Sequence, residues 1–423
     1  MSRKLASPNA ENLEMPPMTN SDMEYDKDDD DEEYAADEIS FSDKGLSDGQ
    51  LNSLYEKGRF RLIQERNDFM LPQVRDLVKR EKWIIPRPHY QRRHRWNRTK
   101  QSALIESFLM NAPVPPIYLY ESSIGRYEVM DGQQRLNAIM EFFNNEFRLS
   151  GLQTWPALNG KRYSTLPSKV SRGLERAKIS SNILVFDNPG EGEAAEDIRA
   201  LVFNRLNTGG VRLNAQELRN CLYSGDMNDL IIELSGDENF TNAWAIPSHD
   251  ENIDEDGIVS AELETNLLYR SMDDCQLVLR FFAFRERDRL RGSTRRILDE
   301  CMNRYKKMDE KQIEEFKEDF LSAMELSVDL FGDDAFRLPG NLSGKRLLSK
   351  PLFDAILIAL SINMEERDKL LENASFVRKA VDQLLNDPNA YEILVGRGNT
   401  AEHIANRIDL VDASLKDAII EVD

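Results

Sequence analysis

The chain has 423 residues, of which 40% are apolar and 31% charged, and its formal net charge is -20. This length allows two or three domains and is ample for a buried core. No stretch approaches the roughly 18 uninterrupted apolar residues of a membrane-spanning helix, and the N-terminus lacks the apolar core of a signal peptide. We therefore expect a cytoplasmic protein with no membrane partner. The three cysteines, Cys221, Cys275 and Cys301, have no CxxC spacing, so they indicate buried core positions and neither a disulfide framework nor a zinc cluster.

The acidic excess is concentrated at the N-terminus. Residues 1–50 hold 15 acidic and four basic side chains, a balance of -11 that leaves only -9 for the rest of the chain. A segment with so much charge and so little to bury is predicted to be disordered, and we assign residues 1–48 to an acidic tail. Three interpretations stay open: the tail keeps the protein soluble, competes with nucleic acid for the protein's own basic surface, or is itself the interacting part.

Two basic stretches follow. Residues 82–105 contain seven basic side chains, no acidic one and interleaved aromatics, a composition typical of phosphate binding. Residues 285–307 hold nine basic against four acidic side chains, and their arginines would share one face with Arg280 if a helix continued past Gly292. A solvated helix face explains this second stretch equally well. The candidate DNA-binding residues are Arg93, Arg95, Arg98, Arg287, Arg291 and Arg295.

The apolar spacing predicts helices at 71–83 and 99–110, followed by strands at 116–121 and 127–130 that are joined through Gly125. A helix is predicted from about residue 133 and a strand at 183–186. Two more helices are predicted, at 194–206 and from Asn214. Asn214 with Glu217 has the pattern of a capping box. Residues 248–264 read as an acidic loop, and almost everything after Cys275 as helices. The fold class is therefore α+β, a small mixed sheet with helices followed by an all-α C-terminal domain. We place the boundaries at 49–235 for the α+β domain, 236–265 for an acidic loop and 266–423 for the helical domain.

One short motif carries most of the chemistry. Asp131, Gly132, Gln133, Gln134 and Arg135 stand where a predicted strand meets the N-terminus of a helix. Such a terminus has unpaired N–H groups and favours a phosphate. Gly132 lets the backbone approach an oxygen, Asp131 can cap the helix or bind a divalent ion, and Arg135 offers two donors to phosphate. Taken alone, the motif favours an ordinary turn in which Asp131 caps the helix and Arg135 is solvated.

Two further polar segments accompany it. The first is Tyr90, Gln91 and Arg92; the second is Asn204, Arg205, Asn207, Thr208, Gly209 and Gly210. Core packing requires none of these residue types, so their coincidence favours one pocket for a charged, hydrogen-bonding ligand, and a nucleotide fits best.

At these residues the sequence resembles the DGQQR proteins of the ParB/sulfiredoxin-like superfamily, the domain type at the N-terminus of GmrSD type IV restriction enzymes and of the phosphorothioate-sensing Ssp defence NTPase. The segments YQR, PPIYLYE, YEVMDGQQRLNAI, FNRLNTGG and LNAQELRN follow in that family's order. The resemblance implies a ParB/sulfiredoxin-like sheet, binding and hydrolysis of a nucleoside triphosphate with Mg²⁺, DNA as the other ligand, and restriction of phage or foreign DNA. It also implies that Asp131, Gln133, Gln134 and Arg135 are catalytic, with Asp131 at the metal. Gly132, Arg92 and the FNRLNTGG residues would complete the nucleotide site.

One departure concerns the nuclease. Many relatives carry a C-terminal HNH domain, which needs two histidines around a metal. After residue 94 this chain has only His249 and His403, so we expect no HNH site and a partner protein that cuts DNA. The expected function is an NTP-hydrolysing DNA sensor of a restriction or phage-defence system. The alternative is a ParB-like DNA-binding protein in which the nucleotide acts only as a switch.

Overall fold

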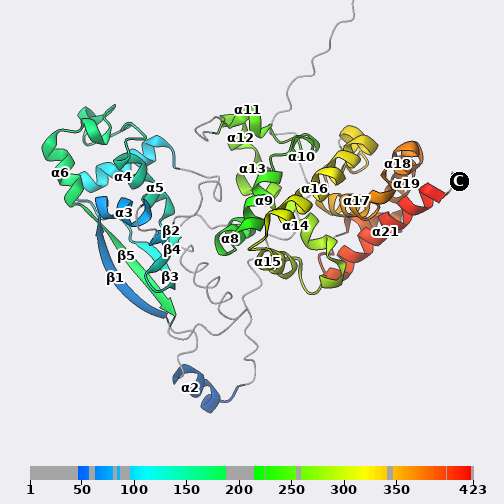
Figure 1. Cartoon of the computed structure of the whole chain (residues 1–423), viewed down its shortest axis with the longest axis horizontal. Helices are drawn as coiled ribbons and strands as arrows, with labels where there is room; N and C mark the ends of the chain where they lie inside the picture. The colour runs from blue at the N-terminus through cyan, green and yellow to red at the C-terminus, as the bar shows by residue number, and fades with distance from the viewer. Residues whose placement is uncertain are drawn as a thin grey trace, which may run out of the picture.

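The computed structural model describes residues 46–56, 62–79, 83–85, 96–186, 214–223, 225–253, 259–340, 346–396 and 398–420. The predicted acidic tail and the predicted helix 194–206 lie outside these residues. Two hydrophobic cores organise the described part, one in an α+β domain and one in a C-terminal domain made of helices (Figure 1). The predicted fold class is confirmed. Among the residues described, no helix combines the length and apolarity needed to cross a membrane.

The α+β domain is built on a mixed five-stranded sheet with the order β1-β5-β3-β4-β2. Its strands are β1 (Leu62–Met70), β2 (Ile84–Ile85), β3 (Ile117–Ser123), β4 (Arg126–Asp131) and β5 (Lys178–Phe186). The pairs β1–β5 and β3–β4 are antiparallel, whereas β3–β5 and β2–β4 are parallel. The predicted hairpin forms as expected, with Gly125 at φ +71° in the turn. Strands β3 and β4 therefore occupy the middle of the sheet.

Helices cover one face of this sheet (Figure 1). They are α3 (Leu71–Lys79), α4 (Arg98–Leu109), α5 (Gln133–Phe143) and α6 (Ser168–Arg176), while α2 (Asp48–Glu56) precedes β1. The core is formed by alternate strand residues, such as Ile117 and Leu119, packed against the apolar stripes of α4 and α5. Side chains alternate between the two faces along a strand and repeat every 3.6 residues around a helix, so each element buries its apolar side against the other. The site described below lies where β4 runs into α5.

The C-terminal domain consists of helices packed around a single large core. Its helices are α8 (Ala215–Leu222), α9 (Asp226–Leu234), α10 (Glu238–Ala243), α11 (His249–Asn252), α12 (Ala261–Thr265), α13 (Leu267–Ser271), α14 (Asp273–Arg285), α15 (Thr294–Arg304), α16 (Glu310–Phe331), α17 (Lys350–Ile362), α18 (Arg367–Glu372), α19 (Ala374–Asn386), α20 (Pro388–Val395) and α21 (Ala401–Ile420). Helix α17 is buried along nearly its whole length and lies against α14, α16 and α21. Cys275 and Cys301 are buried free thiols, as predicted; the side chain of Cys221 lies outside the described set.

Two details of the helical region differ from the sequence-based prediction. The stretch 248–264 is not simply a loop, because it contains α11 and α12. The core of the helical domain also begins earlier than residue 266. Met227 of α9 belongs to this core, as do Phe240 and Trp244, which fall within the segment assigned to an acidic loop. The acidic residues there lie between buried aromatic ones, so composition alone hides the packing.

Candidate functional site

The DGQQR motif folds as a strand, a glycine turn and a helix, as its sequence predicts. Asp131 is the last residue of β4, Gly132 is the N-cap at φ +96°, and α5 begins at Gln133. A Cβ at position 132 would lie 2.5 Å from Cγ2 of Ile117, so only glycine fits this backbone without a shift. No side chain caps the α5 N-terminus. Its first N–H groups and its positive dipole end therefore present an anion-binding geometry.

Asp131 and Arg135 form an ion pair across the first turn of α5. Nη2 of Arg135 donates to Oδ2 of Asp131 at 2.8 Å and to the carbonyl oxygen of Pro116 at 3.1 Å. The Arg135 side chain is only 14% exposed, and its Nε atom is buried without a hydrogen-bond partner. Asp131 is 33% exposed. The guanidinium is thus held rigidly beside the helix N-terminus, with one donor unused.

A register shift next to the motif places Asp131 on the same face of the sheet as Tyr118. Leu119 pairs with Val129, but Tyr118 pairs with Asp131, so Met130 is the extra residue of a β-bulge. Bulges re-aim side chains and are common beside active sites. Tyr118 also pairs with Asn182 of β5. Directly opposed residues share a sheet face, so the bulge places Asp131, Tyr118 and Asn182 in one row.

Asn182 is a site residue that the sequence analysis missed. It is 3% exposed, and its side-chain oxygen has no hydrogen-bond partner. Leaving such an acceptor unpaired costs about 1–3 kcal/mol. The available signal was weak, because Asn182 follows two serines and directly precedes the apolar run ILVF, and only the part from Ile183 onward was interpreted as a buried strand.

The two glutamines of the motif make contacts within the protein. Nε2 of Gln133 donates to Oδ1 of Asn137 one turn further along α5, at 2.9 Å. Oε1 of Gln134 accepts from the backbone N–H of Trp96 at 3.2 Å. Gln134 therefore connects the motif to Trp96, which lies in the basic segment 82–105, two residues before α4 begins. This contact indicates a positioning role for Gln134; the catalytic role inferred from the resemblance stays a prediction.

The described arginines of the predicted DNA-binding set are mostly paired with acidic side chains. Arg98 donates to Glu141 of α5 at 2.6 Å and remains 49% exposed. The helix that would place Arg280, Arg287, Arg291 and Arg295 on one face does not continue past Gly292, because α14 ends at Arg285 and Gly292 adopts a φ of +86° before α15 begins. The ion pairs of this stretch are Arg287 with Asp409, Arg295 with Asp299, and Arg304 with Glu286, while Arg291 is exposed.

Several predicted site residues fall outside the described residues. They are Tyr90, Gln91, Arg92, Arg93, Arg95, Asn204, Arg205, Asn207, Thr208, Gly209 and Gly210. Their assignment to the nucleotide site or to DNA stays a prediction. Within the described ranges, no group of three or more His, Cys, Asp or Glu side chains is arranged to hold a metal ion. The single carboxylate of Asp131 stays the predicted contact for a metal that arrives with the nucleotide.

The segment LNAQELRN anchors the chain to the helical domain. Asn214 and Glu217 form the predicted capping box at the start of α8. Arg219, which is 2% exposed, donates from Nε to Asp299 of α15 at 2.8 Å. Oδ1 of Asn220 accepts from Gln216, and its Nδ2 lies 3.2 Å from the sulfur of Met272. This group of polar residues is therefore explained by packing of α8 against the helical domain.

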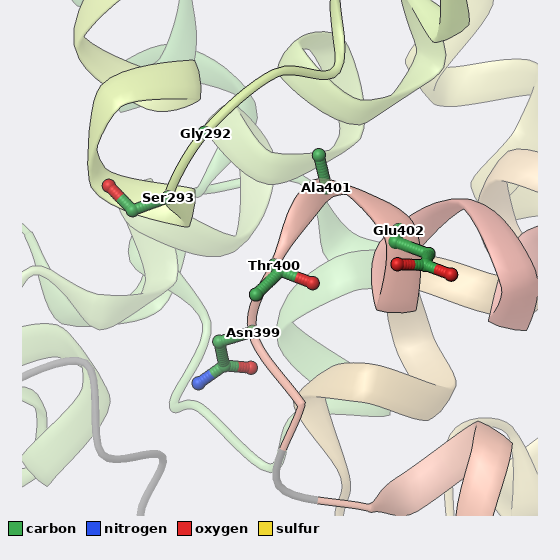
Figure 2. Close-up of a pocket in the computed structure, with 6 residues that line it drawn as sticks. All are labelled: Gly292, Ser293, Asn399, Thr400, Ala401 and Glu402. Carbon is green, nitrogen blue, oxygen red and sulfur yellow. The ribbon is translucent and has the colours of Figure 1, made fainter.

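A separate pocket opens within the helical domain. Figure 2 shows it where the chain leading into α15 meets the chain leading into α21, and its volume is about 580 Å³. Ser293 and Thr400 pair there as an isolated bridge, and Oγ1 of Thr294 donates to the carbonyl oxygen of Asn399 at 2.8 Å. Glu402 contributes a carboxylate to the lining. Although two helices begin here, the carboxylate makes the pocket a poor match for the phosphate predicted at the DGQQR turn.

Comparison with known protein families matches residues 74–224 to the N-terminal domain of the GmrSD restriction endonuclease. The matched region runs from α3 through the β4–α5 turn and ends just after α8. It thus contains the whole row formed by Asp131, Tyr118 and Asn182, and it agrees with the resemblance that the motif suggested. Neither the curated proteins nor the solved structures contain a match to this chain.

Proposed function

We propose that this chain is the nucleotide-hydrolysing, DNA-sensing component of a restriction or phage-defence system, and that a partner protein supplies any cleavage of DNA. The match to the GmrSD N-terminal domain supports the setting. The observation that carries the nucleotide assignment is the uncapped N-terminus of α5, entered through Gly132 and flanked by the largely buried guanidinium of Arg135. This combination of a helix N-terminus with no side-chain cap, a helix dipole and a fixed cation suits a polyphosphate.

Hydrolysis requires a positioned water and stabilisation of the charge on the transferred phosphoryl group. Asp131 fits a Mg²⁺ site of the usual kind, in which one or two carboxylates share the ion with substrate phosphates. Bound there, Mg²⁺ would neutralise phosphate charge. Arg135 would then offer its unused Nε donor to a phosphate oxygen while Nη2 keeps its contact with Pro116. In this proposal, Asp131 contacts the metal and Arg135 the phosphates.

Phosphate release from each NTP with Mg²⁺, with and without DNA, tests this proposal. Asp131→Asn and Arg135→Ala are expected to lose at least tenfold in turnover, because a positioned charge at a transferring phosphoryl group contributes several kcal/mol. Asp68→Asn on β1 and Arg172→Ala on α6 are matched charge-removing controls at exposed positions of the same domain. Turnover that survives in the two site variants would refute the catalytic assignment.

The switch alternative uses the same site and predicts tight nucleotide binding without product. DNA binding is a second test, because both readings predict an affinity that falls steeply with salt as phosphates are neutralised. An affinity that does not change with salt would contradict both. Deleting residues 1–48 separates the interpretations of the acidic tail: competition in cis predicts tighter DNA binding, and a tail that is itself the interacting part predicts loss of function.

A further inference from the structure

The row across the sheet ends at a buried acceptor that the described structure does not satisfy. Asn182 lies two strands from Asp131, with Tyr118 of β3 between them. At the usual spacing of strands, this separation is about 10 Å. Asn182 is 3% exposed and its Oδ1 has no hydrogen-bond partner. In a folded protein such an atom marks a place where a ligand or water completes the hydrogen bond.

The surroundings change along the row. At one end, Leu184 occupies the next position of β5 on the same face and is 6% exposed. At the other end, the Asp131 side chain is 33% exposed. The row is therefore closed and partly apolar beside Asn182, and open and charged beside the α5 N-terminus. A ligand with an apolar ring system at one end and a polyphosphate at the other matches this gradient.

Resting on the function proposed above, we infer that Asn182 contacts the nucleoside of the bound nucleotide. Its Oδ1 accepts a hydrogen bond from an N–H of the base or an O–H of the sugar, while the phosphates occupy the α5 N-terminus. Tyr118, which lies between the two ends, offers its ring to the nucleoside, because base–aromatic stacking is favourable for every base. Asn182 thus distinguishes a nucleotide from a bare polyphosphate.

The test measures binding of NTPs and of inorganic tripolyphosphate, both with Mg²⁺, to the full chain. Asn182→Ala and Asn182→Leu are expected to weaken NTP binding about tenfold, the effect of one hydrogen bond left unmade, and to leave tripolyphosphate binding unchanged. Asn67→Ala on β1 is the matched control, since Asn67 is an exposed asparagine of the neighbouring strand. Asn182→Leu removes a buried acceptor that has no hydrogen-bond partner, so its melting temperature is expected to equal or exceed that of the wild type.

The outcomes separate this inference from the proposed function. If the wild type binds no NTP, the proposed function fails. If the wild type binds NTP through Asp131 and the Asn182 variants bind it equally well, only the nucleoside contact is refuted. An equal loss of NTP and tripolyphosphate binding in the Asn182 variants also refutes it. Arg66 of β1 is opposite Asn182 in the register. If tripolyphosphate binding depends on Arg66 and not on Arg135, the phosphates bind at the Asn182 end of the row, and the inference is overturned.

Nucleotide analogues identify the donor. If a sugar hydroxyl is the donor, the 2′-deoxy or 3′-deoxy nucleotide is expected to bind the wild type about as weakly as the intact nucleotide binds Asn182→Ala. If a base N–H is the donor, both deoxy forms bind like the intact nucleotide, and the four bases differ in affinity only when Asn182 is present. Either pattern supports the nucleoside contact.

Discussion

Replacing Asp354 by alanine is expected to destabilise the helical domain severely. Asp354 of α17 is fully buried, and both of its carboxylate oxygens accept hydrogen bonds from Arg280 of α14, the shortest at 2.6 Å. Nη1 of Arg407 of α21 lies 3.9 Å away. One carboxylate therefore lies between two buried guanidinium groups, each no more than 1% exposed, and offsets part of their positive charge.

The expected cost follows from what remains after the substitution. Arg280 would keep its charge inside the core without the carboxylate of Asp354, and breaking a buried pair in this way costs about 3–5 kcal/mol. That is a large fraction of the 5–15 kcal/mol that typically stabilises a domain. Asp409→Ala is the matched control. It removes the carboxylate paired with Arg287, but Asp409 is 62% exposed, so its loss is expected to cost at most about 1 kcal/mol.

Urea unfolding followed by circular dichroism and by tryptophan fluorescence, to which Trp244 contributes, measures this difference. Trp244 packs 5.5 Å from the ring of Phe353, next to the substituted residue, and so reports on this core. With urea slopes of about 1–3 kcal/mol per molar, the midpoint of Asp354→Ala should fall by one molar or more. A shift no larger than that of Asp409→Ala would show that the buried Arg280–Asp354 pair does not stabilise the domain as argued here.

Three further substitutions test other parts of the structure. Gly132→Ala places a Cβ 2.5 Å from Ile117 at a positive φ, so it should lower stability by about 2 kcal/mol or more; an unchanged melting temperature would contradict the turn geometry. Burial and the hydrogen bond to Glu175 raise the pKa of Tyr163 to about 12, so the advantage of wild type over Tyr163→Phe should be complete below pH 10 and disappear as the pH approaches 12, measured by unfolding at several pH values. Asn228 is buried with both side-chain polar atoms unpartnered. Asn228→Leu should therefore raise the free energy of unfolding by about 1–3 kcal/mol, which is measured as a higher urea midpoint.

The local features of the site were predictable from the sequence because short-range patterns determine them. A β-type run, a glycine and a helical period meet at Asp131, and the capping box at Asn214 is a four-residue pattern. The role of Asn182 was not predictable, because it depends on a bulge in β4 and on the parallel pairing of β3 with β5. Local spacing carries no information about which strand lies beside which.

The same limit explains the errors about charge. Composition marked residues 285–307 as a basic surface, but their partners come from distant positions, such as Asp409 for Arg287 and Asp319 for Arg285. Net charge in a window counts only neighbours in sequence. The acidic segment 236–265 was misjudged for a related reason: a few buried aromatic residues, Phe240 and Trp244 among them, decide the packing there, although acidic side chains dominate the composition.

The anchoring of α8 has a consequence for where the chain can be divided. The amide of Asn214, the N-cap of α8, donates to the carbonyl oxygen of Ser271. Arg219 fixes the same helix to α15 through Asp299. The family match ends at residue 224, although α8 is held by residues that come later in the chain. A fragment cut after residue 224 would therefore separate α8 from the helical surface that holds it, and its buried polar side chains would lose their partners.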